Sequence, residues 1–220
     1  MQDAYNLGWK LALVASLRAE AALLESYEDE RIPVAKRLLS TTDRAFSLAV
    51  SESWLAGIFR TRVLARIAAL AMTHERIRRV AFLTIAHIGI HYRASALSQT
   101  LAGVAAAAPQ AGGRFPWLRL KLVANGEVQD LYEHFDDTRF NLIVIGQSAP
   151  EDAISGAKEL VRTQVIPEDA VNGSELERVH IAQPSYYLLR PDGHSGLAGT
   201  KLDVAEVNRY LSERVLLRAA

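Results

Sequence analysis

Apolar residues recur at helical spacing over roughly the first 87 positions of the chain. The opening stretch carries two neighbouring apolar stripes, Leu7, Leu11, Val14 and Leu17 in one and Trp9 and Leu13 in the other. A helix with two such stripes is expected to be buried on more than one side. The sequence therefore predicts an amphipathic first helix that packs against several neighbours.

Two further helical stretches are predicted before residue 87. Pro33 suits the first turn of a helix, where its missing N–H is not needed, so we expect the second helix to begin there. Its buried side is predicted to contain Ala35, Leu38, Leu39, Ala45, Phe46, Leu48 and Ala49. The third helix is predicted to bury Leu55, Ile58, Phe59, Val63, Leu64, Ile67 and Leu70.

The pattern changes after residue 100. Residues 101–116 are rich in Ala, Gly and Pro and lack a sustained apolar period, which is typical of a linker. We therefore predict a helical segment over residues 1–100, a linker over 101–116 and a second domain over 117–220.

The second domain reads mainly as strands. Apolar residues alternate from 118 to 122, and residues 140–146 form a continuous apolar run of the kind found in central strands. Further strands are predicted at 178–182 and 186–190, with a tight turn at Pro191-Asp192-Gly193. Helical pieces are predicted at 131–135, 151–162 and 203–215.

This order of elements is that of a thioredoxin-like fold. The sequence thus predicts an α+β protein: an N-terminal helical segment followed by a thioredoxin-like α/β domain. Such folds often place a cis proline before the corresponding strand, so we predict a cis peptide bond at Pro184. The chain contains no cysteine, which makes the domain redox-inactive and excludes disulfides, thiolate catalysis and a thioredoxin-like reductase.

Charge and hydropathy exclude further classes of partner. Lys and Arg number 25, as do Asp and Glu, so we expect neither nucleic acid nor an anionic membrane as a partner. The uncharged run from Leu11 to Leu17 is far shorter than a membrane span, and Asp3 stands where a leader would be basic. We therefore expect a cytoplasmic protein.

The chain carries no complete catalytic motif. Gly-x-Ser-x-Gly, Walker, Gly-x-Gly-x-x-Gly and His-Glu-x-x-His patterns do not occur in its sequence. His87 and His91 are spaced for one face, but no third ligand accompanies them, so we predict no metal. His134, His180 and His194 receive no role, and the turn chemistry alone explains Arg190 to Gly196.

Six arginines between residues 60 and 79 could form a phosphate-binding face or simply a solvated helix surface. The neutral net charge and the neighbouring Glu75 favour a solvated helix surface. The arginines concerned are Arg60, Arg62, Arg66, Arg76, Arg78 and Arg79.

Several segments together resemble a known enzyme family. They are MQDAYNLGWKLALV, LLESYEDERIPVAKRLLSTTDRAFSLAVSESWLAGIFRTRVLARIAALAM, GGRFPWLRL, LYEHF, FNLIVIG and YYLLRPDGHSGLAG. In this order, over essentially the whole chain, they look like the carboxyl-terminal part of FAD-dependent aromatic-ring hydroxylases. These are flavoprotein monooxygenases of the phenol hydroxylase and polyketide hydroxylase type.

The resemblance implies a role near FAD for one end of the first helix. In that family this helix points its amino terminus at the flavin, where its N–H groups and dipole favour negative charge. Met1, Gln2, Asp3 and Asn6 match the piece near the flavin, provided that the preceding part of the protein is supplied. The family also implies NAD(P)H use, an aromatic small-molecule substrate and a last domain that serves in packing and subunit contacts.

Two functional hypotheses follow. The first is a truncated or split monooxygenase that lacks the nucleotide-binding and flavin motifs, binds no FAD alone and has no catalytic residue or activity of its own. The second is a non-catalytic interaction module, in which Trp9, Leu11 and Leu13 seek a partner. That partner would be another copy of the chain, giving a homo-oligomer, or a separate flavin domain.

Overall fold

The computed structural model describes residues 2–50, 89–150 and 159–218, and also residues 66, 69–70, 73–75 and 77–78. The chain divides into two compact units, one formed by Met1–Glu30 with His91–Ala220 and the other by Arg31–Ile90. Within the described residues, no helix has both the length and the apolar character needed to cross a membrane.

Helices open the chain, as predicted. They are α1 (Gln2–Ala15), the 3-10 turn η1 (Ala21–Leu24) and α2 (Glu25–Val50). The predicted helix start at Pro33 was wrong, because Pro33 lies inside α2. Leu39 and Phe46 were predicted to be buried but are 63% and 65% exposed. Apolar spacing correctly indicated helix there, but spacing alone does not supply the neighbour that would cover the face.

The buried face of α1 also differs from the prediction. Trp9 and Leu13 are buried, but Leu11 is 45% exposed and Leu17 lies beyond the end of the helix. The remaining buried positions of α1 are the polar residues Asn6 and Lys10. The helix therefore turns its second apolar stripe inward, together with two polar side chains.

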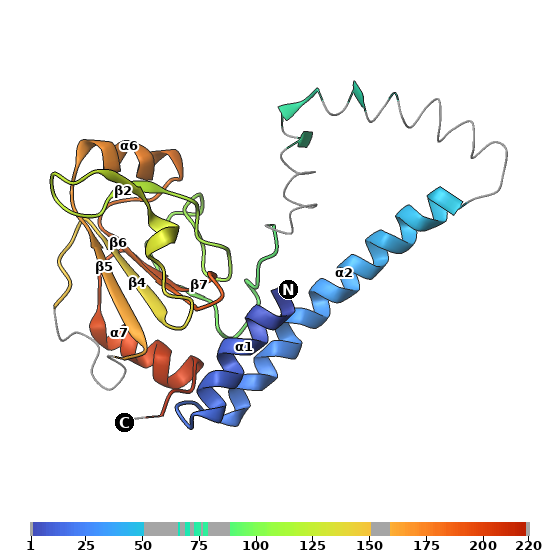
Figure 1. Cartoon of the computed structure of the whole chain (residues 1–220), viewed down its shortest axis with the longest axis horizontal. Helices are drawn as coiled ribbons and strands as arrows, with labels where there is room; N and C mark the ends of the chain where they lie inside the picture. The colour runs from blue at the N-terminus through green and yellow to red at the C-terminus, as the bar shows by residue number, and fades with distance from the viewer. Residues whose placement is uncertain are drawn as a thin grey trace. The chain divides into compact units, whose positions relative to one another are not determined.

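A mixed five-stranded sheet forms the centre of the first unit (Figure 1). Its order is β1 (Gln99–Thr100), β7 (Ser195–Gly199), β6 (Ser185–Leu189), β4 (Phe140–Ile145) and β5 (Val161–Ile166). β6 runs antiparallel to both neighbours, while β4–β5 and β1–β7 are parallel. The predicted central strand is confirmed, since every residue of β4 is buried.

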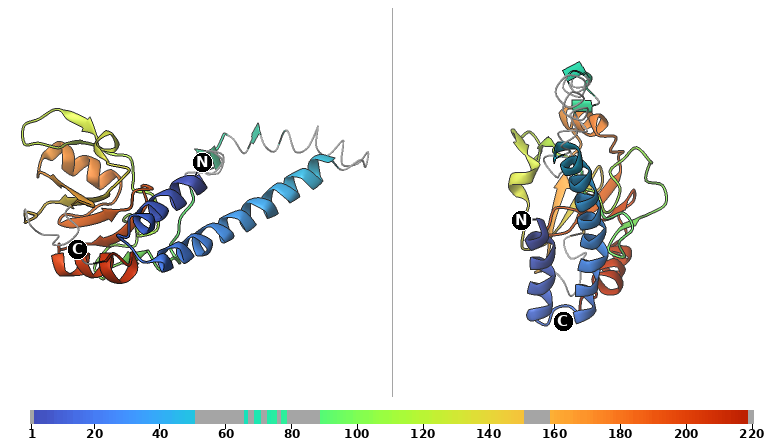
Figure 2. Two further views of the ribbon diagram at one scale, coloured as in Figure 1. Left: turned by 60° about the horizontal axis from the view of Figure 1, so that its bottom comes forward. Right: turned by 90° about the vertical axis from the view of Figure 1, so that its right-hand side faces the viewer.

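Side chains of alternating strand residues fill two cores on the two faces of this sheet. Leu142 and Val144 of β4 pack in one core with α1, α7 (Val204–Arg209) and the π-helical turn η4 (Tyr210–Arg214). Ile143 and Ile145 pack in the other with β2 (Arg119–Lys121), η3 (Leu131–His134) and α6 (Ala170–Arg178). β2 pairs with β3 (Val128–Asp130), and Figures 1 and 2 show α6 and α7 on opposite faces.

Several smaller predictions are settled by the structure. The helical pieces at 131–135 and 203–215 are confirmed by η3 and by α7 with η4. The hairpin around Pro191-Asp192-Gly193 is confirmed as β6–β7. The Gln183–Pro184 peptide bond is cis, as predicted.

Two predictions in the second domain were wrong. Residues 178–182 are not a strand but the end of α6 and the turn after it, where Val179 and Ile181 pack on the second core. A strand, β5, begins at Val161 instead, so the predicted helix over 151–162 is wrong at its last two residues. Residues 151–158 lie outside the described part. A short apolar run is consistent with either a helix or a strand. For this reason the sequence pattern placed a helix over part of β5 and a strand at the end of α6.

The predicted linker packs along β7 within the first unit. The Gly112 N–H donates to the Ser195 carbonyl at 2.6 Å, and the Ser195 N–H donates to the Gly113 carbonyl at 2.8 Å. Ala111 and Phe115 are buried there. The domain boundaries proposed from the sequence stay a prediction.

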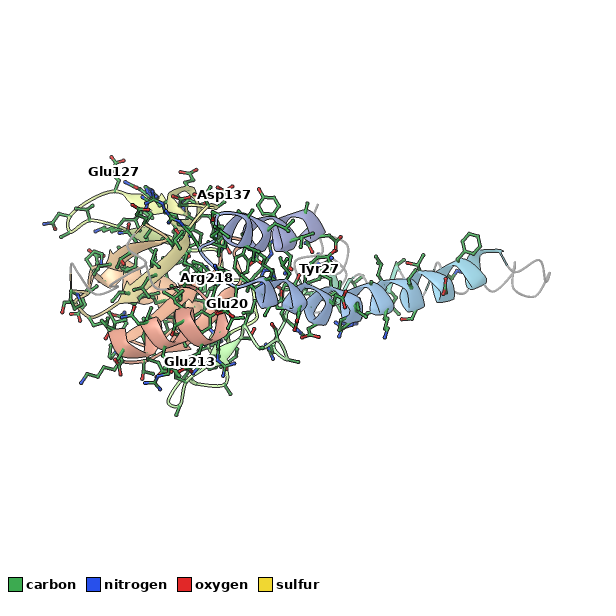
Figure 3. The ribbon with its side chains drawn as sticks, turned by 90° about the horizontal axis from the view of Figure 1, so that it is seen from below. Glu20, Tyr27, Glu127, Asp137, Glu213 and Arg218 are labelled. Atoms are coloured by element: carbon green, nitrogen blue, oxygen red, sulfur yellow. The ribbon has the colours of Figure 1, made fainter. Side chains whose placement is uncertain are left out.

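The last described residues lie beside the loop that follows α1. Ala19 and Leu217 form an antiparallel bridge, and the Glu20 N–H donates to the Leu216 carbonyl at 3.0 Å. Glu20 and Arg218 mark this place in Figure 3. The loop after α1 is therefore held by the residues that follow η4.

Candidate functional site

A cluster of charged side chains is buried where the β6–β7 turn meets α1 and the start of α2. The turn contributes Arg190 and Asp192, α2 contributes Glu30, and α1 contributes Asn6 and Lys10. None of the five is more than 6% exposed. We call these five residues the ionic cluster.

Arg190 lies at the centre of the ionic cluster. Its Nη1 and Nη2 donate to the two carboxylate oxygens of Glu30 at 2.5 and 3.2 Å, and its Nε donates to Asp192 Oδ1 at 3.1 Å. The guanidinium carbon lies 5.5 Å from the ring centre of Trp9 and 5.4 Å from that of Tyr92. One side chain thus binds two carboxylates and contacts two aromatic rings.

The α1 residues complete the coordination of Glu30. Lys10 Nζ donates to Glu30 Oε2 and to Asn6 Oδ1, each at 3.0 Å, while Asn6 Nδ2 donates to Glu30 Oε2 at 2.6 Å. Ser95 Oγ donates to the other Glu30 oxygen at 2.7 Å. Trp9 Nε1 donates to Asp192 Oδ2 at 3.3 Å. The two carboxylates are therefore held from three separate segments.

Burial and pairing act in opposite directions on the protonation of the ionic cluster. Burial alone would raise the pKa of Glu30, but Arg190 and Lys10 outweigh it and lower that pKa to about 2. Burial would likewise raise the pKa of Asp192, and Arg190 again holds it below its usual range. Burial lowers the pKa of Lys10, against the attraction of Glu30. Two ionised carboxylates facing two cations balance the buried charge.

His194 borders the ionic cluster. Its Nδ1 lies 3.3 Å from Asp192 Oδ1, and its ring centre lies 4.6 Å from that of Tyr92. Its Nε2 is buried and has no hydrogen-bond partner among the described residues. With Nδ1 protonated, the imidazole donates to Asp192 and so orients that carboxylate toward Arg190.

The turn chemistry explains why Arg190 and Asp192 point the same way. Gly193 takes a positive φ of 78°, and its N–H donates to the Arg190 carbonyl at 2.9 Å. The Arg190 N–H donates to the His194 carbonyl at 2.8 Å. A tight turn therefore holds the two charged residues as a rigid pair.

The residues predicted to lie near a cofactor are distributed over the first turns of α1. Met1 lies outside the described residues. Gln2 is partly exposed and Asp3 is exposed in the first turn, while Asn6 points inward and binds Glu30. Their predicted position near a flavin stays a prediction.

The other candidates from the sequence were two histidines and six arginines. His91 is exposed and His87 lies outside the described residues. Arg66 and Arg78 are exposed, in accord with the solvated surface preferred above; the other four arginines lie outside the described part.

Sequence reasoning missed the ionic cluster. It treated Arg190 and Asp192 as turn residues and gave Lys10 and Glu30 no role. A signal was available in α1, where Asn6 and Lys10 lie one helical turn apart beside Trp9, on the face that is buried. Polar residues on an apolar face indicate buried partners, but in this chain those partners are far away in the sequence.

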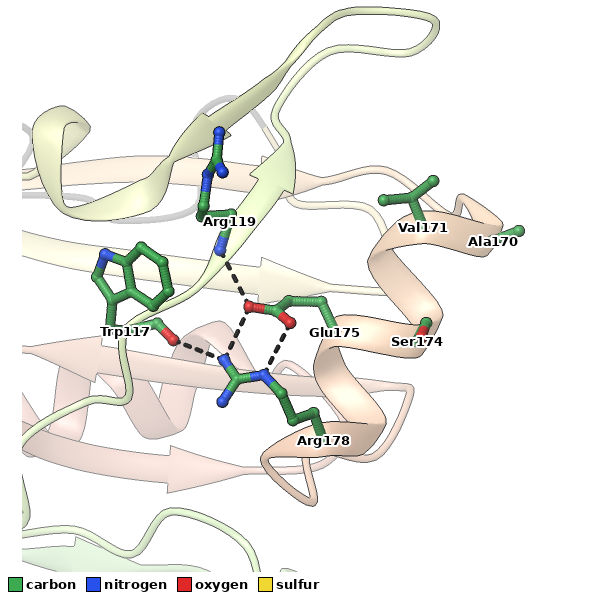
Figure 4. A pocket seen from close by; sticks show the side chains of 7 residues that line it. All are labelled: Trp117, Arg119, Ala170, Val171, Ser174, Glu175 and Arg178. Carbon is green, nitrogen blue, oxygen red and sulfur yellow. Dashed lines mark hydrogen bonds and ion pairs between the residues drawn. The ribbon is translucent and has the colours of Figure 1, made fainter. Parts of the chain in front are cut away.

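Two hollows open on the surface of the first unit. One, of about 430 Å³, runs beside α1, where Tyr5, Gly8 and Trp9 face Phe140 and Pro191. The other, of about 590 Å³, lies between β2 and α6 around Trp117 (Figure 4).

The polar groups around Trp117 form hydrogen bonds with one another. Trp117 Nε1 donates to Asp130 at 2.6 Å, and Arg178 Nη2 donates to the Trp117 carbonyl at 3.0 Å. Arg178 also forms a two-pronged pair with Glu175, drawn as dashed lines in Figure 4. These contacts hold α6 against β2.

Comparison with known proteins relates the chain to flavin enzymes. The family model described as FAD binding domain matches residues 1–42. 6-methylpretetramide 4-monooxygenase of Streptomyces rimosus is 28% identical over 99% of this chain and 41% of its own length. An uncharacterized aromatic compound monooxygenase of Bacillus subtilis is 28% identical over 88% of this chain and 34% of its own length.

Solved structures agree with the sequence relatives. BexE, studied for oxidation during BE-7585A biosynthesis, superimposes with a TM-score of 0.66 at 26% identity, over 100% of this chain and 40% of that protein. The chain thus spans about two fifths of the length of such proteins. In sequence and fold, it is a relative of the carboxyl-terminal part of FAD-dependent aromatic hydroxylases.

Proposed function

We propose that the chain supplies the carboxyl-terminal part of an FAD-dependent, NAD(P)H-using monooxygenase that hydroxylates an aromatic compound. The observation that carries the proposal is the match to an aromatic monooxygenase along 99% of this chain. The FAD-binding family match over residues 1–42 adds support, because it covers α1 and part of α2. On this proposal the sheet is a thioredoxin-like domain without redox cysteines, and the protein works in the cytoplasm.

The residues of this chain fit FAD only in part. The first turn of α1, which contains Gln2 and Asp3, presents the positive end of a helix dipole. The sequence contains no Gly-x-Gly-x-x-Gly turn to hold a pyrophosphate. We therefore propose that α1 approaches the flavin, and that holding FAD requires residues from a further polypeptide segment.

A binding and turnover experiment tests this proposal. The purified chain is dialysed against FAD, and the flavin retained per protein is measured by absorbance. NAD(P)H oxidation is then followed with and without phenolic substrates. The proposal predicts no retained flavin and no substrate-stimulated oxidation. A stoichiometric FAD complex of the chain alone would sink it.

A second candidate function is an interaction module that acts in trans. Of the three residues expected to seek a partner, Trp9 and Leu13 are buried within the chain and Leu11 is 45% exposed, so Leu11 is the one that supports this candidate. The partner would be another copy of the chain or a separate flavin domain. Size-exclusion chromatography with light scattering tests self-association, since a monomer at all concentrations contradicts that form of the idea. Adding a relative's isolated flavin domain tests the other form.

A further inference from the structure

The ionic cluster joins residues inside the stretch that matches the FAD binding domain to residues outside it. Asn6, Lys10 and Glu30 lie within the stretch that matches an FAD binding domain, which ends at residue 42. Arg190 and Asp192 lie outside that match, in the turn between β6 and β7. The ionic cluster is therefore a point at which the sheet binds the helix that matches the flavin-binding family.

The geometry of Arg190 makes this attachment orientation-specific. A guanidinium presents its N–H donors in a rigid planar fork, and in this cluster the fork engages Glu30 along one edge and Asp192 along another. Glu30 in turn accepts from Lys10 and Asn6, which are one turn apart on α1. Rotating or sliding α1 would leave buried carboxylate or ammonium groups unpaired, which is costly.

Stability alone is a weak explanation for this arrangement. Buried ion pairs contribute little net stability compared with apolar side chains of similar volume, because both ions must first be desolvated. What they add is a single geometry that satisfies every charge. Trp9 and Leu13 already supply the apolar contact between α1 and the sheet.

We propose that Arg190 is a positioning residue for the flavin-facing end of α1. Through Glu30 and Asp192 it fixes the rotation and axial position of α1 on the sheet, and so places the turn with Gln2 and Asp3 one helical turn before Asn6. The sheet thereby acts as a brace for cofactor binding although it has no redox chemistry. This inference rests on the proposed function, in which the start of α1 approaches the flavin.

Hydrogen exchange measured by mass spectrometry tests the brace in the 220-residue chain without any flavin. In Arg190→Gln, the amides of α1 are expected to lose nearly all protection, by about a hundredfold or more, while those of β4 and β6 stay measurably protected. Arg178→Gln is the matched control, because Arg178 pairs with one carboxylate at an exposed position of the same unit. Its α1 amides are expected to exchange as in the unmodified chain.

Two results would overturn the proposal. One is an α1 that stays protected in Arg190→Gln; the other is loss of protection in α1 and the sheet together, which describes a general stabiliser. If Arg190→Gln does not fold, Lys10→Met removes one cation from the α1 side, and α1 protection is expected to fall by at least about tenfold ahead of the sheet. Because no flavin is present, failure of the brace is distinguishable from failure of FAD-enzyme function.

Discussion

Glu30 shows how a single buried carboxylate links three segments of the first unit. It accepts hydrogen bonds from Arg190, Lys10, Asn6 and Ser95, which bring together α1, the β6–β7 turn and the segment before β1. Its 2% exposure leaves little room for water to replace any of them. Protonation of Glu30 would weaken all four contacts at once.

The pKa of Glu30 predicts an acid-labile contribution to stability. Because the folded-state pKa is about 2 and the ordinary value is 4.5, ionised Glu30 stabilises the fold above pH 4.5. This contribution, on the order of 3 kcal/mol, is lost as the pH falls from 4.5 toward 2. Urea unfolding at a series of pH values is expected to show a shallower dependence in Glu30→Gln than in the unmodified chain.

Glu213 provides the control for that series. It is exposed near the end of η4, and Figure 3 labels it. Glu213→Gln is expected to keep the full pH dependence. Equal slopes in Glu30→Gln and the unmodified chain between pH 4.5 and 2 would contradict the role given to Glu30.

The surroundings of two glycines predict opposite changes in the free energy of unfolding when each is replaced by alanine. A Cβ on Gly196 in β7 would collide with the Tyr210 ring, whose hydroxyl donates to the Leu97 carbonyl at 2.8 Å. A Cβ on Gly8, inside α1, would meet no atom within 4 Å. Gly196→Ala is therefore expected to lower the free energy of unfolding by about 1–3 kcal/mol through overpacking.

Gly8→Ala is expected to raise the free energy of unfolding by about 0.5–1 kcal/mol, because alanine restricts the unfolded chain and favours helix. Chemical denaturation of both variants measures the difference. The same sign of change in both would show that the surroundings of Gly8 and Gly196 do not differ in the way the structure indicates.

Elements with a strong local pattern were predictable from the sequence, and elements with a weak one were not. β4 has six consecutive buried apolar or amide residues, and its run of Leu142, Ile143 and Val144 made it recognisable. β5 alternates polar and apolar residues only partly, with Arg162 and Thr163 exposed side by side. Its strand character comes from pairing with β4, which a local pattern does not contain.

α7 has an N-cap whose loss should be measurable. Asp203 Oδ1 accepts from the Ala205 N–H at 2.8 Å and so satisfies one of the free donors at the start of the helix. Asp203→Ala is expected to lower the free energy of unfolding by about 1 kcal/mol. Asp203→Ser is expected to cause a smaller loss, because serine also caps helices well. Thermal unfolding compares the two, and an equal loss in both would contradict a capping role.

The ionic cluster forms only when distant parts of the first unit fold together, so its contacts were not predictable from a local sequence pattern. Its members lie at positions 6, 10, 30, 190 and 192, so the contacts appear only when the hairpin β6–β7 packs against α1. The sequence resemblance did point to the FAD-dependent aromatic hydroxylases to which the chain is similar, and the predicted α+β fold is confirmed. It assigned the helix but not the residues that hold it.

At the same scale, the proposed function makes the sheet a support for cofactor binding rather than a site of chemistry. The described residues contain no group of three or more His, Asp or Glu side chains arranged for a metal ion. The ionic cluster, whose members are nearly all hydrogen-bonded to one another, faces inward rather than into either surface hollow. On the proposed function, the flavin carries the chemistry and the sheet supports the helix that approaches it.

Retained flavin tests the central claim most directly. The purified 220-residue chain is saturated with FAD and dialysed, and the flavin left per protein is measured by absorbance. We predict that essentially none remains, because α1 offers the cofactor only one helix end. A stoichiometric complex that survives dialysis would contradict this claim.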